Sequence, residues 1–111
     1  MKSEEYGLLF LKRKLPYGEN LPSIQIAKST VNANSLLSFI ERLDEYDCSS
    51  LIYDLIRCIG SNSNVDEGFF TDTVEHMSIL YKYPNVEIDD ILIIPMFDLK
   101  KIVEEWLEFI K

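Results

Sequence analysis

The sequence predicts a small single α+β domain, residues 1–111, in which an α-helical hairpin and a C-terminal helix pack on an antiparallel sheet of about four strands. Three observations lead to this prediction. Two β-rich segments near the N-terminus are joined by a turn, mid-chain segments have helical apolar spacing, and an aliphatic run enters an amphipathic C-terminus. With 111 residues, 47% of them hydrophobic, the chain can bury one core without disulfides or metals.

The C-terminal segment, Ile91–Lys111, gives the strongest signal. Its aliphatic run Ile91–Ile94 has the length of a strand and stops at Pro95. Asp98 then stands where a helix N-cap is expected, because its side chain can accept an unpaired N–H of the first turn. Apolar residues follow at three- and four-residue steps: Leu99, Ile102, Val103, Trp106 and Ile110. This spacing predicts one buried face of a C-terminal helix.

The N-terminal segments predict a β-hairpin. Tyr6–Leu15 is rich in aromatic and apolar residues, and we expect it to form the first strand. Pro16–Asn20 has the composition of a turn. In Ser23–Lys28, Ile24 and Ile26 alternate with smaller or polar residues, which is typical of a strand with one buried face. The short connection favours antiparallel pairing of the two strands.

Two amphipathic segments follow and predict the helical hairpin. Asn32–Ser35 offers N-caps for a helix that runs to about Tyr46. Asp47–Ser50 should break this helix and cap the next one, which Gly60 should end. The expected inward residues are Leu36, Leu37, Ile40 and Leu43 in the first helix and Leu51, Ile52, Leu55, Ile56 and Ile59 in the second. Because the link is short, we expect the two helices to be antiparallel neighbours.

The segment after the helices allows two interpretations. Residues 60–68 form a loop that is too short to be a domain linker. Within Phe69–Tyr83, a helix would bury Val74, Met77 and Leu80, whereas a strand would alternate Met77, Ile79, Tyr81 and Tyr83. The β-branched and aromatic content favours a strand for the later half. We expect it to turn at Pro84-Asn85 and pair with a strand over Val86–Ile94.

The cysteines and the N-terminus indicate a cytoplasmic protein. Cys48 and Cys58 are ten residues apart, roughly 15 Å on a straight helix, which is too far for a disulfide. Neither has a Cys or His at metal-ligand spacing, so we expect two reduced thiols. The apolar part of the N-terminus is too short for a signal peptide and ends at Lys12–Lys14. No apolar run approaches the roughly 20 residues of a membrane span.

The net charge of −8 is concentrated in the middle of the chain. Residues 1–40 carry five Lys or Arg and three Asp or Glu, residues 41–98 three and thirteen, and residues 99–111 three of each. This balance argues against nucleic acid as a partner, because phosphate contacts need a basic surface. It suits solubility, and equally it suits a basic protein partner that is attracted by the acidic field.

No catalytic or metal-binding pattern stands out. The single His76 has Glu75 beside it, but a surface or hydrogen-bonded role is better supported than acid–base catalysis. Asp89-Asp90 with Glu87 lacks the spacing of a calcium loop, so a solvated hairpin face is the better interpretation. The glycines are too far apart for a phosphate-binding loop. We expect neither an enzyme nor a cofactor or metal site.

The C-terminal arrangement resembles a known family. Ile94-Pro95, then Phe97-Asp98-Leu99, then the amphipathic run from Ile102 to Phe109 look like the tail of small bacterial immunity proteins. These are the cognate inhibitors of contact-dependent growth inhibition toxins and related polymorphic toxins. The resemblance covers roughly the last twenty-five residues, together with the size and acidity of the chain. It implies a single cytoplasmic domain that binds a toxin domain, often a nuclease, and covers its active or substrate-binding surface.

The expected partner is therefore a basic toxin domain, with no nucleic acid or membrane partner and with a monomer favoured over a homo-oligomer. An acidic adaptor or regulatory module is the alternative. Carboxylates would face a basic groove, and tyrosines would act as anchors. Tyr46 and Tyr53 are possible anchors. The predicted partner-binding residues are Asp44, Glu45, Asp47, Asp66, Glu67, Asp72, Tyr81, Tyr83, Glu87, Asp89 and Asp90.

Overall fold

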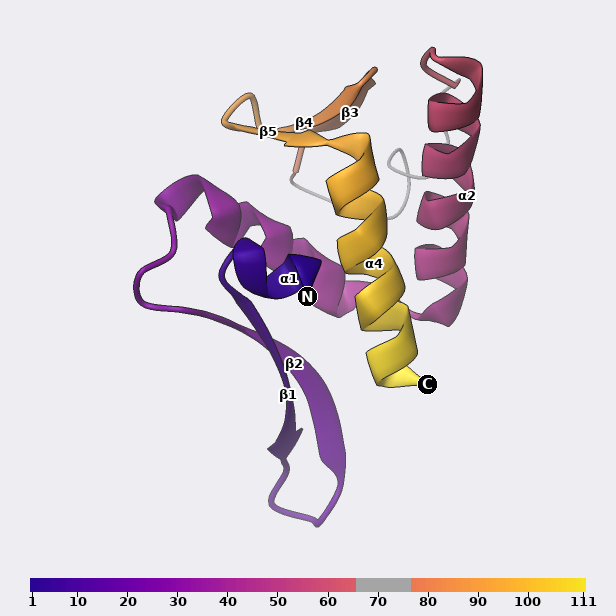
Figure 1. Cartoon of the computed structure of the whole chain (residues 1–111). Coiled ribbons are helices and arrows are strands. Elements are labelled where there is room, and N and C mark those ends of the chain that lie inside the picture. The colour runs from indigo at the N-terminus through magenta and orange to yellow at the C-terminus, as the bar shows by residue number, and fades with distance from the viewer. Residues whose placement is uncertain (66–76) are drawn as a thin grey trace.

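The computed structural model describes residues 1–65 and 77–111 and confirms the α+β class. Figure 1 shows the helices between two small groups of strands. The elements in chain order are α1 (Lys2–Glu5), β1 (Leu8–Lys14), β2 (Asn20–Ile26), the 3-10 helix η1 (Asn32–Arg42), α2 (Glu45–Ser61), β3 (Ile79–Lys82), β4 (Asn85–Ile88), β5 (Leu92–Pro95) and α4 (Met96–Ile110).

The strands form two antiparallel sheets instead of one. β1 and β2 pair from Leu8–Ile26 to Lys14–Asn20, which confirms the predicted hairpin. The other sheet has the order β3-β4-β5. In Figure 1 the two sheets lie towards opposite ends of α4. The long connection between β2 and β3 contains η1 and α2. In the sequence these helices separate the β1-β2 pair from the β3-β4-β5 sheet, and within each sheet consecutive strands are neighbours.

The predicted boundary between the two middle helices is wrong by a few residues. η1 ends at Arg42, and α2 begins at Glu45. Asp44 is the N-cap: its Oδ1 accepts the N–H of Asp47 at 2.7 Å, and Asp47 Oδ2 accepts the N–H of Asp44 at 3.4 Å. This reciprocal pair satisfies two otherwise unpaired donors, and it fixes the helix start before Tyr46 rather than after it.

Helix α2 packs beside α4 rather than back along η1. In Figure 1 α2 and α4 run side by side in opposite directions, while η1, in purple, passes behind α4 and leads into the start of α2. The buried residues of α2 are Cys48, Leu51, Leu55 and Cys58. Both thiols are free, as predicted. Burial, followed by the nearby charge of Asp47, raises the pKa of Cys48 to about 12, so this thiol stays protonated at neutral pH.

The strand interpretation is confirmed for the part of residues 69–83 that the structure describes. β3 spans Ile79–Lys82, while residues 69–76 lie outside the described ranges. The expected single strand over Val86–Ile94 is divided into β4 and β5. The turn between them holds Asp89 and Asp90 at φ of 53° and 57°, a left-handed conformation that Asp tolerates better than most side chains.

The predicted face of the C-terminal helix is confirmed. Leu99, Ile102, Val103 and Trp106 are buried. Asp98, however, does not cap this helix. Pro95 ends β5 with a φ of −57° that already suits a helix start, so α4 begins at Met96, two residues before Asp98.

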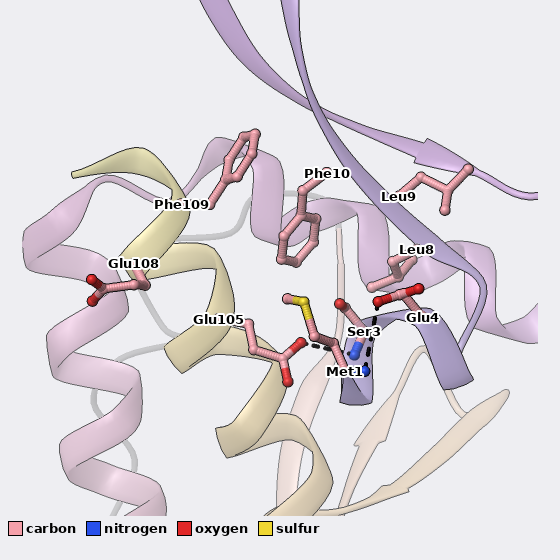
Figure 2. Close-up of a pocket in the computed structure, with 9 residues that line it drawn as sticks. All are labelled: Met1, Ser3, Glu4, Leu8, Leu9, Phe10, Glu105, Glu108 and Phe109. Carbon is pink, nitrogen blue, oxygen red and sulfur yellow. Dashed lines mark hydrogen bonds and ion pairs between the residues drawn. The ribbon is translucent and has the colours of Figure 1, made fainter.

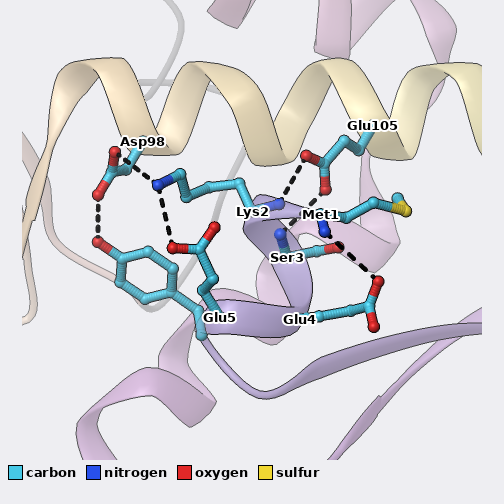
Figure 3. Close-up of polar contacts among 8 residues, drawn as sticks. Met1, Lys2, Ser3, Glu4, Glu5, Asp98 and Glu105 are labelled. Carbon is cyan, nitrogen blue, oxygen red and sulfur yellow. Dashed lines mark hydrogen bonds and ion pairs between the residues drawn. The ribbon is translucent and has the colours of Figure 1, made fainter.

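Asp98 instead belongs to a polar cluster that fastens the start of the chain to α4 (Figure 3). The Tyr6 hydroxyl donates to Asp98 at 2.6 Å, and Lys2 Nζ lies 3.6 Å from the same carboxylate. About two turns further along α4, the carboxylate of Glu105 accepts the N–H groups of Lys2 and Ser3, both at 2.9 Å. Glu105 thereby satisfies two donors at the start of α1. Residues near both ends of the sequence are thus joined in one polar cluster.

None of the helices in the described ranges combines the length and apolar composition that crossing a membrane requires.

Candidate protein-binding site

A row of large side chains projects from α2 into solvent. Tyr46 is 77% exposed, Tyr53 62% and Ile56 49%. Their seven- and three-residue spacing places them along one side of the helix. The expectation that Ile56 points inward is wrong, because the buried face of α2 is narrower than predicted and centres on Leu51 and Leu55. Neighbouring exposed apolar and aromatic side chains of this size are typical of an interaction surface.

Two members of this row, Tyr53 and Ile56, line a hollow between α2 and α4, which we call the α2–α4 groove. Its volume is about 450 Å³. The lining residues are Ser49, Ile52, Tyr53 and Ile56 from α2 and Glu104, Leu107 and Glu108 from α4. The apolar groups form the walls, and the two glutamates supply negative charge. The groove can therefore accept a side chain with an apolar body and a cationic end.

The start of α2, just before the residues that line the groove, adds carboxylates. Three of the predicted residues lie here: Asp44, Glu45 and Asp47. Their negative charge is favourable at a helix N-terminus. The capping pair uses one oxygen each of Asp44 and Asp47, whereas no described group binds the exposed carboxylate of Glu45. Since α2 and α4 are antiparallel, this end of α2 lies near the C-terminal end of α4 (Figure 1).

A few cations partly neutralise the groove. The Arg57 guanidinium lies 5.5 Å from the centroid of the Tyr53 ring and 4.0 Å from Asp54. Lys100 pairs with Glu104 at 3.2 Å, and Lys111 with Glu108 at 3.9 Å. The Lys111–Glu108 pair is exposed on both sides, and such a pair contributes only about 0–1 kcal/mol, so a partner's cation can displace it. Lys100 and Asp54 are largely buried, so the other two pairs are held more firmly.

The structure gives two predicted tyrosines, Tyr81 in β3 and Tyr83 just after it, hydrogen-bond partners in and at the end of α2. The Tyr81 hydroxyl donates to Asp54 at 2.8 Å, and the Tyr83 hydroxyl donates to Asn62 at 2.8 Å. Burial and the hydrogen bond to Asp54 raise the pKa of Tyr81 far above its usual value. Both bonds join β3 to the C-terminal half of α2, so these rings hold the sheet against the helices.

The predicted acidic residues of the sheet are also engaged internally. Glu87 lies 3.1 Å from Lys82, and this lysine, followed by Asp90, lowers the pKa of Glu87. Asp89 Oδ1 accepts the N–H of Ser78 at 2.7 Å and so fixes the turn between β4 and β5 to the start of β3. These residues lie towards the opposite end of the molecule from the first turn of α2 (Figure 1).

The structure thus divides the predicted partner-binding residues into two groups. Asp44, Glu45 and Asp47 lie in the cap and first turn of α2, ahead of the residues that line the α2–α4 groove. Tyr81, Tyr83, Glu87, Asp89 and Asp90 instead belong to the three-stranded sheet, its turns or the contacts around it. Asp66, Glu67 and Asp72 lie outside the described residues, as does His76. Sequence reasoning missed the contributions of Ile56, Glu104, Leu107 and Glu108. The only sequence signal was the helical spacing of Tyr46, Tyr53 and Ile56, and that spacing alone does not identify which face is exposed.

Within residues 1–65 and 77–111, no group of three or more His, Cys, Asp or Glu side chains is arranged to hold a metal ion. Comparison of the chain with protein-family models, with curated proteins and with solved structures finds no match in any of the three. The exposed surface of α2 and α4 carries an aromatic row and, in the groove beside Tyr53 and Ile56, the carboxylates of Glu104 and Glu108.

Proposed function

We propose that this chain is a bacterial immunity protein that acts in the cytoplasm by binding a cognate basic toxin domain. The observation that carries the proposal is the exposed row of Tyr46, Tyr53 and Ile56 beside the carboxylates of the α2–α4 groove. Large rings left outside the core, next to charged groups, match the central anchors and polar rim of protein–protein interfaces. The resemblance of the C-terminal segment to immunity proteins supports the same proposal.

The charge distribution supports a basic partner. A net charge of −8 attracts a cationic protein over several ångströms and raises the association rate, up to about 10⁸–10⁹ M⁻¹s⁻¹ at low salt. Speed matters for an inhibitor, since the toxin must be captured before it acts. A nuclease carries a basic groove for phosphates, and carboxylates that enter this groove would block its substrate.

The aromatic row would supply most of the affinity. Tyrosines bury a large area with few rotatable bonds, and a small number of such residues usually dominates the binding free energy. Glu45, Glu104 and Glu108 would then select a cationic partner and fix its orientation.

Calorimetric binding tests the proposal directly. The partner is the C-terminal domain encoded by the adjacent upstream reading frame, measured at low and high salt. We expect nanomolar binding that weakens with salt, together with rescue of growth when both proteins are expressed. Absence of binding, or a partner whose expression is harmless, would contradict the proposal. Salt-sensitive binding to a harmless basic protein would instead identify an acidic adaptor.

The tyrosine row has a matched control. Tyr53→Ala should weaken binding by about tenfold or more, because an anchor at the centre of an interface is worth roughly 2 kcal/mol. Tyr17, at the tip of the β1–β2 hairpin, is similarly exposed but lies on a different element. Tyr17→Ala should leave the affinity unchanged. Equal losses for the two variants would show that α2 is not the binding surface.

A further inference from the structure

A second hollow lies on the other side of α4, and the Ser3–Glu105 contact forms part of its lining. We call it the β1–α4 cavity (Figure 2). Its volume is about 510 Å³, within the usual range of pockets that hold a small group. It is lined by Met1, Ser3, Glu4, Leu8, Leu9, Phe10, Glu105, Glu108 and Phe109.

Aromatic rings form one wall of this cavity. Phe10 and Phe109 have ring centroids 5.7 Å apart, and both rings pack against buried Trp106, at 5.0 and 5.6 Å. The packing fixes the position of both phenylalanines. Lys12 Nζ already lies 5.9 Å from the centroid of the Phe109 ring, so this ring is accessible to a cation.

Carboxylates form the rim, and two of them are weakly engaged. Glu105 is bound to the backbone of α1 and is not free for a partner. Glu4 lies 3.6 Å from the amino group of Met1, with its side chain 63% exposed. Glu108 is 82% exposed and lies 3.9 Å from Lys111. Such contacts are weak in water, which leaves both carboxylates open to a stronger cationic partner.

Glu108 connects this cavity to the proposed interface. It lines the β1–α4 cavity and also the α2–α4 groove. A partner seated on the groove would therefore have its surface next to the cavity, across the last turns of α4.

We infer that the β1–α4 cavity receives an arginine side chain of the basic toxin domain. The aliphatic stem would lie along Phe10 and Phe109, and the guanidinium would meet Glu4 at the rim, while Glu108 would add negative charge on the far side of the cavity (Figure 2). Arginine fits better than lysine, because its planar group stacks on rings and forms paired hydrogen bonds with carboxylates. This inference rests on the proposed function for the source of the arginine.

A small probe tests the cavity without the toxin. Acetyl-arginine amide is titrated into the ¹⁵N-labelled protein and followed by NMR, with acetyl-citrulline amide as a neutral control of the same shape. We expect shift changes at Leu8, Phe10 and Phe109 that arginine causes and citrulline does not. Equal responses to the two probes, equal responses to acetyl-lysine amide, or shifts confined to Tyr53 and Ile56 would overturn the assignment.

A single substitution tests the cavity in the complex. Glu4 lines this cavity but not the groove, so Glu4→Gln should weaken toxin binding by about two- to fivefold, the usual scale for one exposed charge pair. Glu19 is exposed in the turn of the β1–β2 hairpin, and Glu19→Gln removes the same charge away from the cavity. This control should bind as the wild type does.

The outcomes separate the two proposals. If the toxin domain binds Glu4→Gln and wild type equally well, the arginine site is overturned while the proposed function stands. If the arginine probe binds in the cavity but no toxin domain binds, the proposed function fails, and with it the toxin as the source of the arginine.

Discussion

Two pairs of tyrosines on and beside α2 differ in what they contact. Tyr81 in β3 donates a hydrogen bond to Asp54 of α2, and Tyr83, just after β3, donates one to Asn62, the C-cap of α2. Tyr46 and Tyr53 project from the N-terminal half of the same helix, and neither hydroxyl has a partner among the described residues. A tyrosine that joins two elements stabilises the fold, whereas one without an internal partner can be offered to another protein.

Two carboxylates of α4 also differ in whether they have a partner within the protein. Glu105 accepts two backbone N–H groups of α1, while Glu108, one turn later, extends into solvent between the two hollows. Residue type is therefore a poor guide to availability. The internal partner decides whether a side chain serves stability or binding.

The largest expected effect separates the two kinds of tyrosine. Tyr81→Ala should lower the free energy of unfolding by about 2–4 kcal/mol, because it removes a half-buried ring and leaves Asp54 without its donor. Tyr46→Ala should change it by less than about 0.5 kcal/mol, as is usual for an exposed side chain. Urea unfolding of both variants measures the difference. Equal losses of unfolding free energy in the two variants would show that the Tyr81–Asp54 hydrogen bond and the burial of Tyr81 do not stabilise the fold.

A smaller effect separates the two glutamates and depends on pH. Burial raises the pKa of Glu105, but the N–H donors of Ser3 and Lys2 outweigh it and lower the pKa below the ordinary value of 4.5. The contribution of Glu105 to stability is thus present above about pH 4.5 and is lost as the pH falls through the lowered folded-state pKa.

Glu105→Gln should cost about 1 kcal/mol at pH 7, after allowance for solvent screening, and less at pH 3. Glu108→Gln removes the same charge one turn away and should leave stability unchanged at both values. Thermal unfolding at pH 7 and pH 3 makes the comparison. A cost for Glu105→Gln that is the same at both values would show that the charged form of Glu105 contributes nothing.

The smallest effect is kinetic. Glu45→Gln should lower the association rate with the toxin domain by about two- to threefold at low salt, because it removes one charge from the proposed acidic rim. Asp90→Asn removes the same charge from the distant sheet, where Asn also tolerates the left-handed turn, and should have the smaller effect. Stopped-flow association at two salt concentrations compares them, and an equal effect of both would indicate steering by net charge alone.

Much of the fold could be predicted because its signals are local. The apolar spacing of α4, the alternation in β2 and the turn at Pro84-Asn85 all lie within about ten residues of chain, where periodicity and turn chemistry are informative. The predicted helix boundary was wrong where two residues gave the same local signal for a helix start. Asp44 and Asp47 can both cap a helix, and only their reciprocal hydrogen bonds place the start of α2 at Glu45.

The candidate site was less predictable because it is assembled from separate elements. Acidic composition led to Asp44, Glu45 and Asp47, but also to Glu87, Asp89 and Asp90, which have internal partners. The pairing of α2 with α4 was unforeseen, and it is this pairing that brings Glu104 and Glu108 beside Tyr53.

The sequence by itself determined the α+β class, the β1–β2 hairpin and the buried face of α4. Only the tertiary structure decided that the strands form two sheets, that α2 lies against α4, and which rings and carboxylates remain free. The reason is the distance along the chain between partners: 27 residues separate Tyr81 from Asp54, and 102 separate Ser3 from Glu105. Such contacts form only when the whole core is packed, so no local pattern encodes them.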